Sequence, residues 1–64
     1  MTNAMRDRIG GWLLKPGNTR ERLAELLGMS HDTLARRLDG STDWGWAEIR
    51  KLAVILGCKV SDLQ

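Results

Sequence analysis

The apolar residues near the start of the chain recur at intervals of three and four, the spacing that gathers side chains on one face of an α-helix. The stripe consists of Met5, Ile9, Trp12 and Leu13. It predicts a first helix that is capped by Thr2 or Asn3 and runs to about Leu14. Gly10 and Gly11 lie inside it and each cost about 1 kcal/mol relative to alanine. Such a helix must depend on tertiary packing, or another backbone must approach closely at the glycines.

The segment Arg20–Gly40 reads as two short helices joined by a tight turn. The first has an apolar face of Leu23, Ala24 and Leu27. Gly28 follows, as expected just past a helix C-terminus, because glycine enters the left-handed region without a Cβ penalty. Ser30 offers a hydroxyl as the N-cap of the second helix, which buries Leu34 and Leu38. The small side chain of Ala24 allows the two helices to cross closely.

The residues between the first and second helices form a turn. In Lys15–Asn18, proline fixes φ and glycine permits a positive φ. Thr19 is the expected cap of the second helix. Asn18 competes for that role, because Glu21 three residues later completes a capping box.

A fourth helix is expected after the polar loop Ser41–Asp43, with Asp43 as its cap and a start near Trp44. Its apolar stripe is Ile49, Leu52, Ala53 and Leu56, with Ile55 beside it. Gly57 closes it. Val60 and Leu63 suggest one further turn folded over the core, although Lys59 is a poor cap. No stretch alternates as a strand would, so we expect an all-α fold of four or five short helices.

The composition restricts the class of protein but does not indicate a function. The 64 residues make one domain, 1–64, and the 42% hydrophobic and 28% charged residues are typical of a soluble globular protein. No apolar run reaches membrane-span length and no signal peptide opens the chain. One cysteine, Cys58, and one histidine, His31, build neither a disulfide framework nor a zinc site. We expect no cofactor and a reducing, cytoplasmic setting.

The net charge of +2 favours a polyanionic partner only weakly. Residues 1–18 carry an excess of two positive charges, whereas residues 19–40 contain four basic and four acidic side chains. Any basic surface must therefore come from where the charges lie rather than from their sum.

The segment 20–39 has the pattern of a helix-turn-helix, a unit whose second helix usually reads DNA. From Thr19 to Leu63 the chain resembles the phage repressor/Cro type of helix-turn-helix domain, also called the XRE type. The resemblance is carried by the joint spacing of Ala24, Gly28, Leu34, Gly40, Ala53 and Gly57. It implies a compact lambda-repressor-like bundle that binds operator DNA, often as a two-fold homodimer on a palindromic site. A chain that holds this domain alone looks most like a Cro acting in a prokaryotic host cell.

If the helix that begins after Ser30 lies in the major groove, the first exposed side chains reach base edges. They are His31, Asp32 and Thr33, with Arg36 one turn later. Arg36 can grip guanine O6 and N7 bidentately, and Asp32 can accept from cytosine N4. His31 can bond guanine N7 or a phosphate, and Thr33 offers a hydroxyl or a methyl.

Affinity should come from contacts to phosphates. The expected residues are Thr19, Arg20, Ser30, Arg37, Ser41 and Thr42. The family places a phosphate contact at Arg20, where the helix dipole and amide donors favour an anion. Arg37 occupies a position that is usually apolar in the family. We therefore expect its stem on the core and its head toward phosphate.

The sequence gives less support to catalysis, to base stacking by tryptophan and to an intersubunit disulfide. Ser30, His31 and Asp32 cannot face one another as a catalytic triad must, because they are neighbours at a helix start. The tryptophans at 12, 44 and 46 could stack on bases, but core packing is the simpler expectation, above all for Trp12. Cys58, Met5 and Met29 are expected to fill the core, and an intersubunit disulfide at Cys58 is the less favoured role.

Three classes of function remain after these arguments. The first is a sequence-specific DNA-binding regulator, either a Cro-like repressor or an antitoxin-type regulator of the same fold. The second is a protein-interaction module that has lost DNA binding, which the electrically neutral motif favours. An enzyme is the third and weakest, because no metal set, phosphate loop or separated acid–base pair is present.

Overall fold

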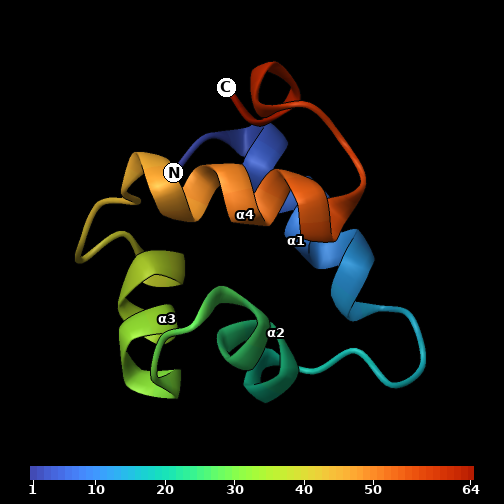
Figure 1. Ribbon diagram of the computed structural model, residues 1–64, viewed down its shortest axis with the longest axis vertical. Coiled ribbons are helices and arrows are strands. Elements are labelled where there is room, and N and C mark those ends of the chain that lie inside the picture. Colours follow the sequence, from blue (N-terminus) through green and yellow to red (C-terminus); the bar gives the residue numbers. More distant parts are fainter.

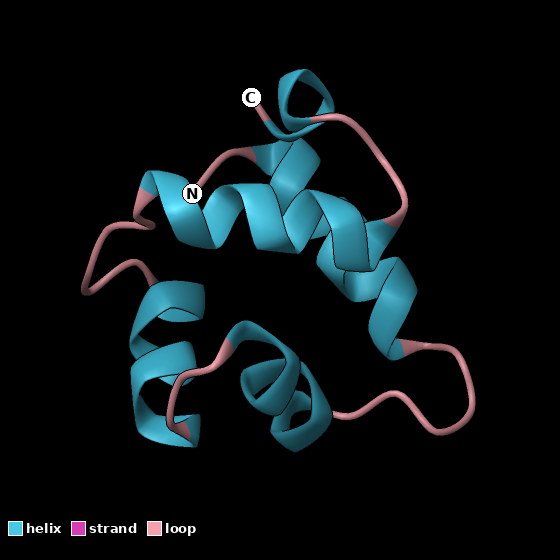
Figure 2. Ribbon diagram, in the orientation of Figure 1, coloured by secondary structure: helices cyan, strands magenta, loops and turns pink.

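The chain folds into four α-helices and one short 3-10 helix, and it contains no strand (Figures 1 and 2). The computed structural model describes residues 1–64. The elements are α1 (Asn3–Leu13), α2 (Arg20–Leu27), α3 (His31–Asp39), α4 (Trp46–Leu56) and η1 (Val60–Leu63). The all-α prediction is confirmed, and the molecule measures 26 × 25 × 18 Å. None of the helices has the length and apolar character needed to cross a membrane.

The core draws on every element. Four leucines are fully enclosed, one each from α2, α3, α4 and η1: Leu23, Leu34, Leu52 and Leu63. Met5 and Ile9 of α1 complete it with Ala24, Leu27 and Ala53. Burial of one leucine stabilises the fold by roughly 1.5–3 kcal/mol relative to exposure. The predicted stripes supply most of this core, but some of their members are only partly buried and pack against it: Trp12, Leu13, Leu38, Ile49 and Leu56.

The two chain ends are tied together, and Figure 1 shows them on the same side of the molecule. The Thr2 hydroxyl caps α1 by accepting from the N–H of Met5, and it donates to the carbonyl of Leu63. The expected last turn forms as η1. The carboxylate of Asp62 accepts from the backbone N–H of Lys59 at 3.0 Å, which supplies the cap that the Lys59 side chain lacks.

The two helices of the helix-turn-helix begin and end at the predicted capping and turn residues. Thr19 caps α2, because its hydroxyl accepts from the N–H of Arg22 at 3.1 Å. Asn18 instead donates to the carbonyl of Trp12 at 2.8 Å and ties the turn back to α1. Gly28 has φ +72°, the left-handed conformation expected of it, and Ser30 caps α3.

The predicted start of the fourth helix is wrong by two residues. The N-cap of α4 is Gly45, and Asp43 does not cap it. Glu48 reaches back to accept from the Gly45 N–H at 3.0 Å, which satisfies that donor from the helix side. Trp44 packs against the core, so the loop is held by its side chain and the helix begins only after it.

The two glycines of α1 are not sites of close backbone approach. A Cβ atom built at Gly10 or Gly11 would meet nothing within 4 Å. The first of the two explanations therefore holds, and α1 depends on the packing of Met5 and Ile9 to offset its two glycines.

We expect Gly11→Ala to raise the free energy of unfolding by about 1 kcal/mol, because alanine favours helix and the site is open. Chemical denaturation monitored by circular dichroism measures the change. Gly28→Ala is the matched control. Its positive φ makes the same added methyl destabilising by roughly 1–2 kcal/mol. Equal effects at the two positions would contradict this account.

Candidate nucleic-acid interface

α3 presents a polar face opposite its buried one. Leu34 is 0% exposed and fixes which side of the helix meets the core. His31, Asp32 and Arg36 are exposed, whereas Thr33 is half-buried. Of the four residues predicted to contact bases, three are thus accessible from outside the chain and the fourth lies at the edge of the accessible face.

Asp32 and Arg36 lie one turn apart on this face, the spacing at which acidic and basic side chains often pair. They make no ion pair with each other, since the three ion pairs of the structure involve Arg8, Arg22 and Arg37. The guanidinium of Arg36 and the carboxylate of Asp32 are both accessible at the surface. Each can meet a partner outside the chain.

The N-terminus of α2 is a second polar end near the same unit. Thr19 accepts from a backbone N–H, so its own hydroxyl proton is left for another acceptor. Arg20 begins the helix and is exposed. The first N–H groups of any helix have no intrahelical acceptor. Together these groups suit a phosphate.

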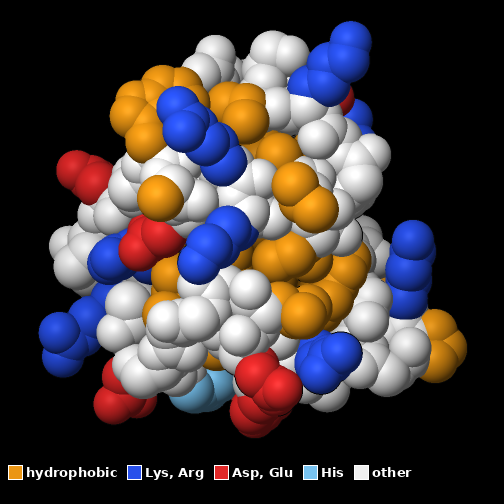
Figure 3. All heavy atoms as spheres, viewed as in Figure 1, with side chains coloured by type: hydrophobic (Ala, Val, Ile, Leu, Met, Phe, Trp, Pro, Cys, Tyr) orange, Lys and Arg blue, Asp and Glu red, His pale blue; other side chains and the backbone are white.

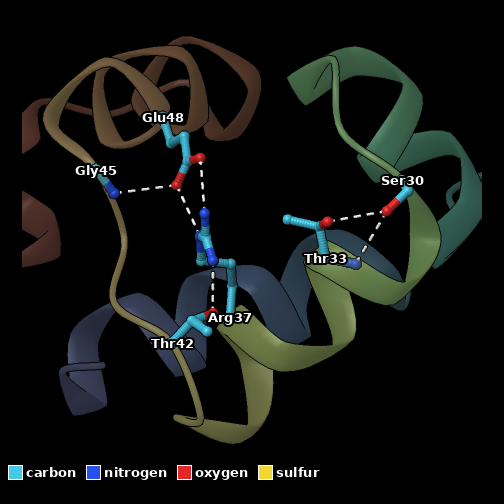
Figure 4. Close-up of polar contacts among 6 residues, drawn as sticks. All are labelled: Ser30, Thr33, Arg37, Thr42, Gly45 and Glu48. Carbon is cyan, nitrogen blue, oxygen red and sulfur yellow. Dashed lines mark hydrogen bonds and ion pairs between the residues drawn. The ribbon is translucent and has the colours of Figure 1, made fainter.

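Arg37 is directed into the molecule, as Figure 4 shows. Its Nε is 2.9 Å from Oε1 of Glu48 and its Nη2 is 3.2 Å from Oε2, a bidentate pair between α3 and α4. Nη1 donates to the hydroxyl of Thr42. The expected packing of its stem is present, because the side chain is only 19% exposed. Its head, however, is bound within the chain instead of being aimed at phosphate.

The Arg37–Glu48 pair favours the charged form of both side chains. The hydrogen bond from Arg37, followed by that from the Gly45 N–H, holds the pKa of Glu48 below its ordinary value. The hydrogen bond to Glu48 likewise raises the pKa of Arg37. Glu48 was not predicted from the sequence as a partner. An arginine at an apolar position and a glutamate three residues after the glycine cap were the available signals.

The hydroxyl groups near the motif are mostly engaged. Ser30 accepts from the N–H of Thr33 at 3.1 Å and donates to the Thr33 hydroxyl at 2.9 Å, so its proton is used within the cap (Figure 4). Ser41 holds the pKa of Asp39 below its ordinary value, through its side chain and then its backbone N–H. Thr42 accepts from Arg37 and retains its own proton.

The three tryptophans and Cys58 divide between core and surface. Trp12, Trp44 and Cys58 are half-buried against the core, so the prediction of core packing is confirmed for Trp12. Trp46 is 60% exposed at the start of α4 and does not belong to the core.

Comparison of the chain with protein-family models, with curated proteins and with solved structures gave no match.

The lowered pKa of Glu48 predicts how stability depends on pH. A carboxyl whose pKa is depressed by folding contributes stability that is present above its unfolded pKa, about 4.3 for glutamate, and that is lost as pH falls through the folded value. We expect Glu48→Gln to be less stable than the wild type at pH 7. The difference should shrink below about pH 4.3. Urea titrations from pH 2 to pH 7 measure it.

The control for this experiment is Glu25→Gln. Glu25 is 3.5 Å from Arg22, but both side chains are more than half exposed, so the pair contributes little. A Glu48→Gln protein with wild-type stability at pH 7 would show that the bridge does not hold α3 to α4.

Proposed function

We propose that this chain is a sequence-specific double-stranded DNA-binding domain of the phage repressor/Cro (XRE) type, with a lambda-repressor-like fold. It acts as a Cro-like repressor in the cytoplasm of a prokaryotic host. The observation that carries the proposal is the α2–α3 unit. A glycine in the left-handed conformation joins the helices, and α3 buries Leu34 while Asp32 and Arg36 are exposed and unpaired.

In this proposal the first turn of α3 enters the major groove. Arg36 donates to guanine O6 and N7, and Asp32 accepts from cytosine N4. His31 reaches a guanine N7 or a phosphate from the first position of the helix. Thr33 contributes through its methyl or its remaining hydroxyl proton at the edge of the face.

Phosphates are held on both sides of α3. Thr19 and Arg20 supply a hydroxyl proton and a charge at the N-terminus of α2, where the helix dipole favours an anion. On the other side of α3, Thr42 offers its remaining hydroxyl proton from the loop before α4, whereas the side chain of Ser41 is engaged with Asp39. Arg37 acts instead by holding α3 against α4, because its guanidinium is engaged with Glu48. A two-fold homodimer on a palindromic site would follow from the family resemblance.

A second function is favoured by the outer face of α4. Trp46 and Val54 are 60% and 81% exposed and lie two turns apart, with Arg50 between them on the same face. Figure 3 shows hydrophobic atoms at the surface near the N-terminal end of α4, with basic side chains beside them. Such a face suits a protein contact, as a protein-interaction module or an antitoxin-type regulator requires. DNA binding that weakens steeply with salt would favour a DNA-binding regulator over a protein-interaction module that has lost DNA binding.

Selection of bound sequences from random duplexes tests the proposal. The wild type should select a short half-site that contains guanine. Arg36→Ala should relax the preference at one position by about 1–3 kcal/mol, roughly 5- to 150-fold. The matched control is Arg50→Ala, which removes the same charge from an exposed site on α4. Selectivity that is unchanged at every position in Arg36→Ala would remove Arg36 from the base-reading residues, and a wild type that selects nothing would overturn the proposal.

A further inference from the structure

A hollow lies on the surface between α1 and the helix-turn-helix unit. It has a volume of about 220 Å³ and opens to solvent between α1, the start of α2 and the end of α3. Its lining residues are Met1, Arg6, Ile9, Gly10, Leu13, Arg20 and Leu38. Two arginines that are distant in the sequence thus flank one concave surface.

Neither of these arginines is neutralised within the chain. The ion pairs of Arg8, Arg22 and Arg37 account for all that the structure contains. Arg20 is also the first residue of α2, where the helix dipole disfavours a cation. Helix stability therefore does not explain its place, and its guanidinium is available to an external anion.

The size of the hollow indicates which kind of anion it can take. Pockets for cofactors and other small molecules usually measure about 300–1,000 Å³ and enclose most of their ligand. This hollow is smaller and open. It does exceed the volume of several water molecules, at about 30 Å³ each. Its volume would admit a single phosphate group attached to a chain that continues outside, and among the lining side chains only the two arginines could hold that group, because the other lining residues are apolar or glycine.

We propose that Arg6 and Arg20 together form a clamp for one backbone phosphate of DNA, with Arg6 supplied by α1. The inference rests on the proposed function and adds a contact that lies outside the helix-turn-helix. Arg6 lies on the same face of α1 as Gly10 and Leu13, which also line the hollow. Gly10 has no side chain there, and the space above it stays open to the ligand.

The clamp would also compensate for the absence of a net positive charge in the helix-turn-helix segment. Residues 19–40 contain as many acidic as basic side chains. Figure 3 shows acidic and basic groups mixed along the lower edge of the molecule, where α2 and α3 lie. Of the basic residues in 1–18, only Arg6 lines the hollow together with Arg20. The phosphate contact therefore draws on charge from outside the motif.

The test measures the salt dependence of binding by the full chain to a random-sequence duplex of about 20 base pairs. Each phosphate contact contributes about 0.9 to the slope of log K against log salt concentration. Because Arg20 stays beside the phosphate, Arg6→Ala should lower the slope by up to about 0.9 and weaken binding by up to roughly eightfold at 0.1 M salt. Arg6→Lys should keep most of the slope, because it keeps the charge.

Arg8→Ala is the matched control. It removes the same charge from the same helix, but Arg8 points to Asp62 at 4.0 Å and lies away from the hollow. Its slope should equal that of the wild type. An unchanged slope in Arg6→Ala, or an equal fall in Arg8→Ala, would overturn the clamp while leaving DNA binding intact. A wild type that does not bind duplex DNA would overturn the proposed function itself, before any variant is compared.

Discussion

The burial of Leu34 is the constraint on which the arrangement of α3 depends. The helix has nine residues, and Leu34 is the only one of them that is fully buried. A helix this short is not stable alone, so packing must hold it. Once Leu34 is enclosed, helical geometry leaves Asp32 and Arg36 on the outer side. The same contact that stabilises α3 therefore decides which of its side chains can meet a ligand.

One apolar contact does not fix the direction of a helix, and the Arg37–Glu48 pair adds a second attachment. The pair joins α3 to the first turn of α4, and the same carboxylate accepts from the Gly45 N–H. Thr42, in the loop between the two helices, accepts from the same guanidinium. Compared with apolar pairs of the same volume, partly buried ion pairs contribute little net stability, although removal of one partner alone is destabilising. Their bidentate geometry is directional, however, and direction is what a helix that enters a groove requires.

The sequence predicted those features that local chemistry determines. Helical periodicity identified the core, and the caps at Thr19 and Ser30 and the turn at Gly28 followed from the preferences of single residues. It failed where a distant contact decides. The start of α4 was misplaced because Trp44 packs on the core, and the head of Arg37 was misdirected because its partner lies eleven residues later. The sequence did not predict that Arg6 and Arg20 line one hollow, because no periodicity links α1 to the start of α2.

The same distinction governs the electrostatics of the interface. The net charge of residues 19–40 is zero, but the four basic residues differ in whether they are paired within the fold. Arg22 and Arg37 are paired with Glu25 and Glu48, which leaves Arg20 and Arg36 available. Arg36 lies on the outer face of α3 and Arg20 at the start of α2, so the proposed base contact and the proposed phosphate contact fall on different helices. Two charges are few for a polyanion, so the proposed interface includes Arg6 of α1, which lines the same hollow as Arg20.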